Sequence, residues 1–274
     1  MNIIDDIKNA FKTANIVEKI IYINVGLFLI TLFTKPFVTN WLALKGNLDV
    51  LITQPWTLLT YGFFHGNFIH LFFNLVFLYY IGNLFLSFFT KKQFLNYFIL
   101  GILAGGIAYL LIKPMGVLVG ASAGIMAVLI GLATKIPNYE LRLNLIGGVK
   151  LWVIALIYIL ISFAGMDGEN SGGNIAHLGG ALIGFIYTKQ LQKGLDIGKF
   201  IENIIDWISN LFKSKPRQPM RTVYKKKNIN RTPTRKETTS KQKQIDTILE
   251  KISKSGYESL SKEEKDFLFK AGKN

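Results

Sequence analysis

The chain has 274 residues, of which 50% are hydrophobic and 18% are charged, and its formal net charge is +15. Most of this charge lies in residues 213–243, which hold twelve Lys and Arg against one acid, Glu237. The rest is nearly neutral and apolar, which is typical of a membrane-embedded body with a basic tail. The basic run has few aromatic residues, so we expect no nucleic-acid partner. The absence of cysteine excludes a cysteine nucleophile, a thiolate metal site and a disulfide.

Residues 19–190 contain six apolar runs, and each run predicts a membrane-spanning helix. The first covers about 20–33 and is expected to end at Lys35-Pro36, because proline stops a helix. The others cover about 65–89, 94–112, 117–134, 149–164 and 175–187. Between the first two runs, Trp41 and Trp56 stand among polar residues, which predicts a first loop that is partly embedded in the membrane. The expected fold is therefore an all-α polytopic membrane protein with a six-helix transmembrane bundle.

Four further segments flank this body. Residues 1–18 predict a short helix on the membrane surface, and residues 195–212 predict an amphipathic helix. Residues 213–243 are expected to be a disordered basic linker. This linker would either bind anionic lipid headgroups or remain solvated without a partner. Residues 244–274 predict a small helical hairpin, in which we identify no candidate catalytic or binding residues. The lysine and arginine bias of the connections predicts that both termini lie in the cytoplasm. The helical C-terminal extension is therefore expected to be cytoplasmic.

The three histidines of the chain, His65, His70 and His177, all lie in or beside apolar runs. Polar side chains in a membrane are costly, so their placement is informative. His70 and Asn74 are four residues apart and therefore point to the same side of a helix. His65 is turned away from them and is expected to do a different job. For any one of these residues alone, an interhelical hydrogen bond is the simplest explanation.

A block of small residues, Gly120 to Gly124, surrounds Ser122. Alone, such a block favours close packing of two membrane helices. With the other polar residues it predicts an acyl-transfer site, in which Ser122 attacks and His177 takes its proton. His70 and Asn74 would donate hydrogen bonds to the developing oxyanion. The apolar parts of these runs hold no carboxylate to orient His177, so a Ser-His dyad is expected.

Small residues also recur every fourth position around His177, at Ala176, Gly180 and Gly184. They form one smooth helix face that allows another helix to approach closely. The partner expected on this face is the fourth run, with its own small residues around Ser122. Such packing would bring the serine hydroxyl to the imidazole.

Three motifs resemble the rhomboid family of intramembrane serine proteases, over about residues 54–187. They are His65-X4-His70-X3-Asn74, Gly120-Ala121-Ser122-Ala123, and the segment from Ala176-His177 to Gly184. The resemblance implies that Ser122 and His177 form the catalytic dyad, and that His70, Asn74 and the Ser122 backbone N–H form the oxyanion hole. His65 and Gly120 would support the motifs, and no metal or other cofactor is implied.

The same resemblance implies the partners and the location of the protein. Substrates would be transmembrane helices, cleaved near their outer ends at small residues with helix-weakening residues nearby. The protein would be of the bacterial type, a multi-pass protein of the plasma (inner) membrane with both termini cytoplasmic. The alternative is a catalytically inactive rhomboid-like protein that binds membrane helices without cutting them.

The chain departs from the family pattern at three positions. Thr57 follows Trp56 where many members have arginine, Leu86 stands in place of an acid, and Met126 stands in place of an aromatic residue. These differences bear on the anchoring of the first loop and on the orientation of His177. By analogy, the glycine-rich loop at residues 165–174 would cap the site.

Overall fold

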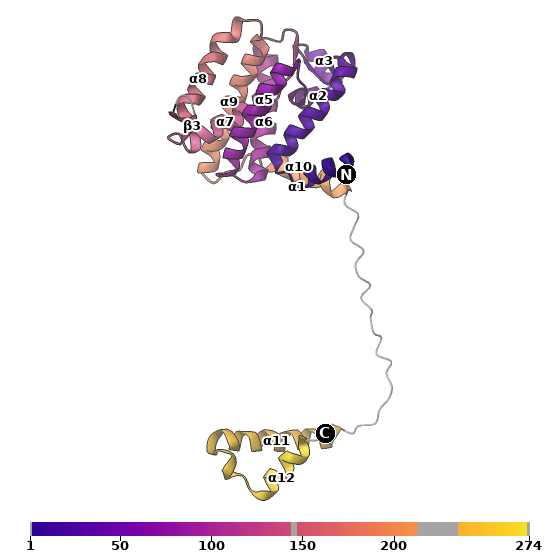
Figure 1. The fold of residues 1–274 in the computed structure, drawn as a ribbon, viewed down its shortest axis with the longest axis vertical. Coiled ribbons are helices and arrows are strands. Elements are labelled where there is room, and N and C mark those ends of the chain that lie inside the picture. The colour runs from indigo at the N-terminus through magenta and orange to yellow at the C-terminus, as the bar shows by residue number, and fades with distance from the viewer. Residues whose placement is uncertain (1, 144–146, 213–234, 273–274) are drawn as a thin grey trace. The chain divides into compact units, whose positions relative to one another are not determined.

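The computed structural model describes residues 2–143, 147–212 and 235–272, which belong to two compact units, residues 1–214 and 215–274. Each of the six predicted apolar runs overlaps a helix of the first unit (Figure 1). These helices are α2 (Ile16–Trp41), α5 (Phe68–Leu86), α6 (Lys91–Ile112), α7 (Ser122–Lys135), α8 (Leu151–Ala164) and α9 (Ser171–Gln192). Among the described residues, α2, α5 and α6 are long and apolar enough to cross a membrane, and α7 and α8 are shorter apolar helices.

The first helix, α2, is longer than predicted. It begins after Asn15, whose side chain caps it in a reciprocal arrangement with Glu18, and it continues through Pro36 to Trp41. The expected stop at Lys35-Pro36 is therefore wrong. The chain kinks at Thr34 instead, with φ −126° and ψ 22°, and the Thr34 hydroxyl donates to the Ile30 carbonyl at 2.9 Å. Proline removes one helical hydrogen bond and kinks a helix, but it does not have to end it.

The first loop is ordered and joins the segment that precedes Ser122. It contains β1 (Leu44–Lys45), α3 (Leu48–Thr53), α4 (Thr57–Thr60) and the 3₁₀ turn η1 (Tyr61–Phe63). Strand β1 pairs antiparallel with β2 (Val117–Leu118), with Leu44 opposite Leu118. A second hairpin, β3 (Glu140–Leu143) with β4 (Gly147–Lys150), precedes α8. The fold is mostly helical, in agreement with the predicted class, and two short antiparallel ladders that were not predicted accompany the helices.

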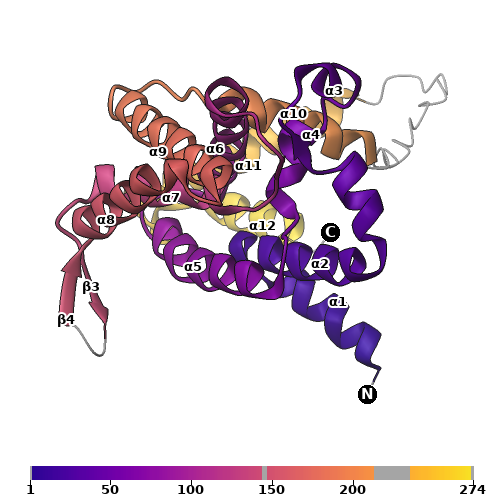
Figure 2. The same cartoon turned by 90° about the horizontal axis from the view of Figure 1, so that it is seen from above.

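Helix α7 is the centre of the bundle, and every residue from 123 to 133 is buried. It packs against α5, α6, α8 and α9, as the view from above shows (Figure 2). A Cβ atom added at Gly180 of α9 would meet the backbone carbonyl of Ala123, and one at Gly184 would meet that of Ala127. The predicted close approach between the small face of α9 and α7 is confirmed. Glycine is required at both positions because the neighbouring atoms belong to the backbone.

Two amphipathic helices accompany the bundle. Helix α1 (Ile3–Thr13) has no buried residue, and α10 (Lys199–Phe212) buries Ile201 while Trp207 is exposed. Lys92, at the start of α6, lies 3.4 Å from the Glu202 carboxylate and 3.2 Å from that of Asp206. These ion pairs attach α10 to the bundle. Both helices are shorter than the predicted ranges 1–18 and 195–212, because α2 already begins at Ile16 and α10 begins at Lys199. Their contact with a membrane surface stays a prediction.

The second unit contains a helical hairpin, as predicted for residues 244–274. Its helices are α11 (Arg235–Ser255) and α12 (Lys262–Ala271), joined by the turn η3 (Tyr257–Ser259). Lys251 of α11 pairs with Glu264 of α12 at 2.9 Å. Helix α11 begins earlier than expected, so the predicted disordered linker is wrong for residues 235–243. The part of that linker at residues 213–234 lies outside the described residues.

Candidate active site

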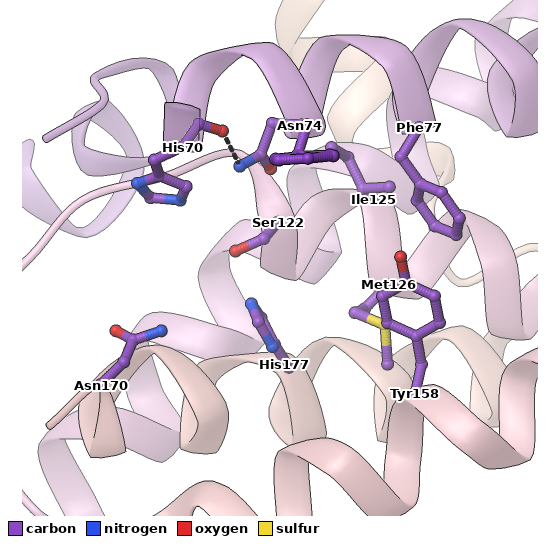
Figure 3. Close-up of a pocket in the computed structure, with 10 residues that line it drawn as sticks. His70, Asn74, Phe77, Ser122, Ile125, Met126, Tyr158, Asn170 and His177 are labelled. Carbon is purple, nitrogen blue, oxygen red and sulfur yellow. Dashed lines mark hydrogen bonds between the residues drawn. The ribbon is translucent and has the colours of Figure 1, made fainter. Parts of the chain in front are cut away.

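A cavity of about 190 Å³ lies among α5, α7, α8 and α9. It is lined by His70, Phe73, Asn74, Phe77, Ser122, Ile125, Met126, Tyr158, Asn170 and His177, most of which are labelled in Figure 3. Four predicted site residues, Ser122, His177, His70 and Asn74, therefore meet in one place from three helices. His65 and Gly120 do not line this cavity, and each contacts His70 from outside it.

Ser122 is the first residue of α7, directly after a sharp bend in the chain. The bend is made by Gly120, whose φ of +134° favours glycine, and the Gly120 N–H donates to the Tyr61 carbonyl at 3.0 Å. The first N–H groups of a helix have no partner within the helix, and the helix dipole makes this end positive. The Ser122 hydroxyl therefore lies beside backbone donors that suit a developing negative charge.

The start of α5 fixes the position of His70 and Asn74. Asn67 caps this helix, and its side-chain oxygen accepts the His70 backbone N–H at 2.8 Å. The Asn74 amide donates to the His70 backbone carbonyl at 2.8 Å, drawn as a dashed line in Figure 3. An amide nitrogen carries two N–H groups, so one of them remains for a ligand. Both side chains project to the side of α5 that Ser122 faces (Figure 3).

Gly120 and His70 pack so closely that only glycine fits. A Cβ atom at position 120 would lie 2.8 Å from His70 Cε1 and 2.9 Å from His70 Nε2. Glycine is therefore required here for two reasons, the positive φ and the neighbouring imidazole. The supporting role of Gly120 stays a prediction, and this contact is consistent with it.

His177 lies on α9, and its ring points toward Ser122 (Figure 3). Its Nδ1 atom is 3.2 Å from Ser162 Oγ of α8, which leaves Nε2 as the nitrogen available to Ser122. Among the described residues, no hydrogen bond joins Ser122 to His177. Catalytic hydrogen bonds are often long in proteins without substrate and tighten when it binds.

Sequence reasoning missed Ser162, although a signal for it exists. Ser162 is the only serine or threonine between residues 151 and 164, and its side chain is 1% exposed. A hydroxyl within an otherwise apolar helix calls for a partner. Its partner, His177, lies on another helix, and the contact arises from the packing of α8 against α9. No local sequence pattern predicts this packing.

His65 lies beside His70, outside the cavity that Ser122 lines. Their ring centroids are 5.1 Å apart, with the ring planes inclined at 67°. His65 is 3% exposed, and neither ring nitrogen has a partner within the described chain. It lines a second cavity of about 580 Å³, together with Lys35 and Asn67. This placement agrees with the expectation that His65 has a different job from His70.

The three departures from the family pattern have local explanations. The Thr57 hydroxyl is buried and donates to the Gln54 carbonyl at 2.7 Å, and Trp56 Nε1 donates to the Trp41 carbonyl at 2.7 Å. These bonds anchor the first loop without an arginine. Leu86 packs against the hydrophobic core. Met126 is buried in the wall of the cavity that holds His177 and provides an apolar surface there.

The loop expected to cap the site is shorter than residues 165–174, because α9 already begins at Ser171. Asn170 of this loop lines the cavity. Asn174 donates to the Gly165 carbonyl at 2.8 Å, and Lys113 pairs with Asp167 at 3.1 Å. The loop is thus tied to both α6 and α9 beside the site.

No metal site accompanies the cavity. Within residues 2–143, 147–212 and 235–272, no group of three or more His, Asp or Glu side chains could hold a metal ion. The cavity lining includes no carboxylate and no lysine or arginine. The polar side chains in the lining are the hydroxyls of Ser122 and Tyr158, the imidazoles of His70 and His177, and the amides of Asn74 and Asn170.

A serine at the start of a buried helix faces an imidazole inside this bundle. Three helices of the described chain are long and apolar enough to cross a membrane, which is the pattern of a multi-pass membrane protein. The family model of the Rhomboid domain matches residues 53–193, just over half of the chain, and the protein belongs to the rhomboid family. A second model, a Family of unknown function (DUF6576), matches residues 232–272, which include all of α11 and α12.

Two curated relatives agree with the family. The chain is 26% identical to "Rhomboid-like protease 3" of Toxoplasma gondii over 163 residues, which cover 58% of each protein. It is 28% identical to "RHOMBOID-like protein 4" of Arabidopsis thaliana over 150 residues, which cover 53% of this chain and 37% of the relative. The chain thus matches less than two thirds of either relative's length.

Proposed function

We propose that this protein is an intramembrane serine endopeptidase that cleaves transmembrane helices near the outer membrane face. The observation that carries the proposal is the meeting of Ser122, His177, His70 and Asn74 around one cavity. Each residue alone has an ordinary structural explanation. Their convergence from α5, α7 and α9 supports a shared chemical role, in agreement with family membership.

In the proposed mechanism, Ser122 Oγ attacks the scissile carbonyl while His177 Nε2 takes the hydroxyl proton. The carbonyl oxygen becomes an oxyanion, which the Ser122 backbone N–H and the side chains of His70 and Asn74 stabilise. His177 then gives the proton to the leaving amine as the C–N bond breaks, and an acyl-enzyme remains. A water molecule repeats these steps on the ester, releases the acid product and restores the Ser122 hydroxyl.

A substrate helix would reach the cavity between α5 and α8. The cavity wall includes Phe73 and Phe77 of α5 and Tyr158 of α8. The rings of Phe77 and Tyr158 are 4.8 Å apart, and they form an aromatic contact between these two helices. A helical backbone has its carbonyl groups bonded internally, so small and helix-weakening residues at the cut would let the substrate unwind into the site.

The proposed topology has six spans, α2 and α5 to α9, with both termini in the cytoplasm. It rests on the lysine and arginine bias of the connections and on the overlap of each predicted apolar run with one of these helices. Ser122, at the start of α7, would then lie toward the outer side. We place the protein in a plasma membrane of the bacterial type. The proposed binding of residues 213–243 to anionic headgroups concerns a segment that lies mostly outside the described residues.

The test compares the wild-type protein with Ser122→Ala and His177→Ala in proteoliposomes that contain a transmembrane substrate. Ser87→Ala, which removes a serine at the opposite end of α5, is the matched control. We expect cleavage by the wild type and the control only, and labelling of Ser122 by a fluorophosphonate that is lost in both site variants. Substrate binding without cleavage or labelling would instead support the inactive, helix-binding alternative.

A further inference from the structure

The second ring nitrogen of His177 has a specific partner. Ser162 Oγ lies 3.2 Å from Nδ1, and this is the hydrogen bond that the structure shows for the imidazole. Ser162 is almost completely buried on α8, at 1% exposure. A buried hydroxyl without a hydrogen-bond partner costs free energy. The contact with Ser162 therefore also favours the observed orientation of the His177 ring.

The proton on the imidazole must be on the correct nitrogen for the proposed chemistry. A neutral imidazole carries one N–H, and the other nitrogen accepts. To take the proton of Ser122, Nε2 of His177 must be bare, and the N–H must therefore be on Nδ1. A group that accepts a hydrogen bond from Nδ1 selects this tautomer.

A serine hydroxyl on a helix can play this accepting part. It has two lone pairs and one proton, so it can accept a hydrogen bond while its own proton points away from the ring. Within the described chain, the bond that the structure shows for Ser162 Oγ is the one to His177 Nδ1, so its lone pairs are placed for the Nδ1–H of His177. If Ser162 donated to Nδ1 instead, the ring proton would lie on Nε2, facing Ser122, and His177 could not act as the base.

We propose that Ser162 is a positioning residue that keeps the proton of His177 on Nδ1 and holds the ring toward Ser122. It occupies the place that a carboxylate takes in a catalytic triad, but it brings no charge. The catalytic consequence of this contact rests on the proposed function. The tautomer of His177 does not rest on the proposed function, because it can be observed in a protein that cleaves no substrate.

The direct test uses the full chain with ¹⁵N-labelled histidine, in which only three imidazoles occur. Loss of a signal in His177→Gln assigns the ring, and the wild type is expected to show Nδ1 protonated and Nε2 bare. Ser162→Ala is expected to shift His177 toward the Nε2–H form, while Ser162→Thr, which keeps the hydroxyl, retains the wild-type shifts. The control Thr31→Val removes a buried hydroxyl on α2 that donates to the Leu27 carbonyl, and it should leave His177 unchanged.

The kinetic test measures kcat and KM for a transmembrane substrate. Ser162→Ala is expected to lower kcat about tenfold, equivalent to about 1.4 kcal/mol, with KM unchanged. A purely structural role would instead lower thermal stability and leave the tautomer in place. Unchanged His177 shifts in Ser162→Ala, or a protonated Nε2 in the wild type, would overturn the inference.

These results separate the two proposals. If the wild type cleaves, Ser122→Ala does not, and Ser162→Ala keeps both kcat and the wild-type tautomer, the positioning role fails and the protease function stands. If the tautomer depends on Ser162 but the wild type cleaves no helix, the contact stands and the proposed function fails.

Discussion

Replacement of Gly120 by alanine tests whether His70 takes part in catalysis. The new Cβ atom would lie 2.8 Å from His70 Cε1 and 2.9 Å from His70 Nε2, closer than unbonded atoms normally approach. Either the imidazole or the loop must move. The neighbouring serine is less affected, because its Oγ atom would be 3.6 Å from the new carbon.

Gly120→Ala is expected to have two separate effects, one on kcat and one on the free energy of folding. Loss of one oxyanion donor costs about 2.7–4 kcal/mol in the transition state, or roughly 100- to 1000-fold in kcat. A side chain at a strongly positive φ also costs about 1–3 kcal/mol of folding free energy. Gly116 provides the matched control, because its φ is +77° and a Cβ atom there would meet nothing within 4 Å. Gly116→Ala therefore has backbone strain without the contact to His70.

The assay measures kcat in proteoliposomes and thermal unfolding for both variants. Both should be less stable than the wild type, and only Gly120→Ala should lose about 100-fold or more in kcat. If folded Gly120→Ala protein retained wild-type kcat, the contact between position 120 and His70 would not be needed to position an oxyanion donor, and the reasoning would be refuted. An equal loss of kcat in Gly116→Ala would show that strain in the loop, rather than displacement of His70, lowers the activity.

Three further outcomes are expected. Tyr158→Ala removes the ring that contacts Phe77 between α5 and α8, so cleavage of transmembrane substrates should rise several-fold; a fall would argue against entry at this place. Gly180→Ala forces a Cβ atom onto the backbone of α7 and should destabilise the protein by about 1–3 kcal/mol, whereas Gly26→Ala, with open space around it, should not. In the C-terminal hairpin, the hydrogen bond from lysine lowers the pKa of Glu264 below its ordinary value of 4.5. Its contribution to stability is therefore present above pH 4.5 and lost as the pH falls below it. The protection of the hairpin amides against exchange, relative to their intrinsic rates, should therefore fall there in the wild type but not in Glu264→Gln.

The helices of the bundle could be predicted because long apolar runs leave few alternatives in a membrane. Their ends could not be predicted as well. The fourth run begins at about residue 117, but α7 starts at Ser122, because the preceding segment pairs with the first loop and turns at Gly120. The two-residue strands β1 and β2 are too short to show an alternating pattern. Pro36 predicted a stop, whereas the helix absorbs it in a kink at Thr34.

The residues of the site could be predicted for a different reason. Ser122, His70, Asn74 and His177 are polar groups in apolar surroundings, and they occur at spacings that a known family shares. Ser162 has the same kind of surroundings but no such spacing to its partner on α9. Its role depends on a contact between two helices, and that contact is a property of the folded bundle.

The packing and the chemistry of this bundle depend on the same atoms. The carbonyl that a Cβ atom at Gly180 would meet belongs to Ala123, the residue directly after Ser122, and Gly180 lies three residues after His177 on α9. Any side chain that separates α7 from α9 at this point must also separate the serine from the imidazole. Hydrogen-bond distances tolerate only a few tenths of an ångström. Activity should therefore be more sensitive than stability to added volume at this interface, and Gly180→Ala protein that remains folded should already have lost most of its kcat.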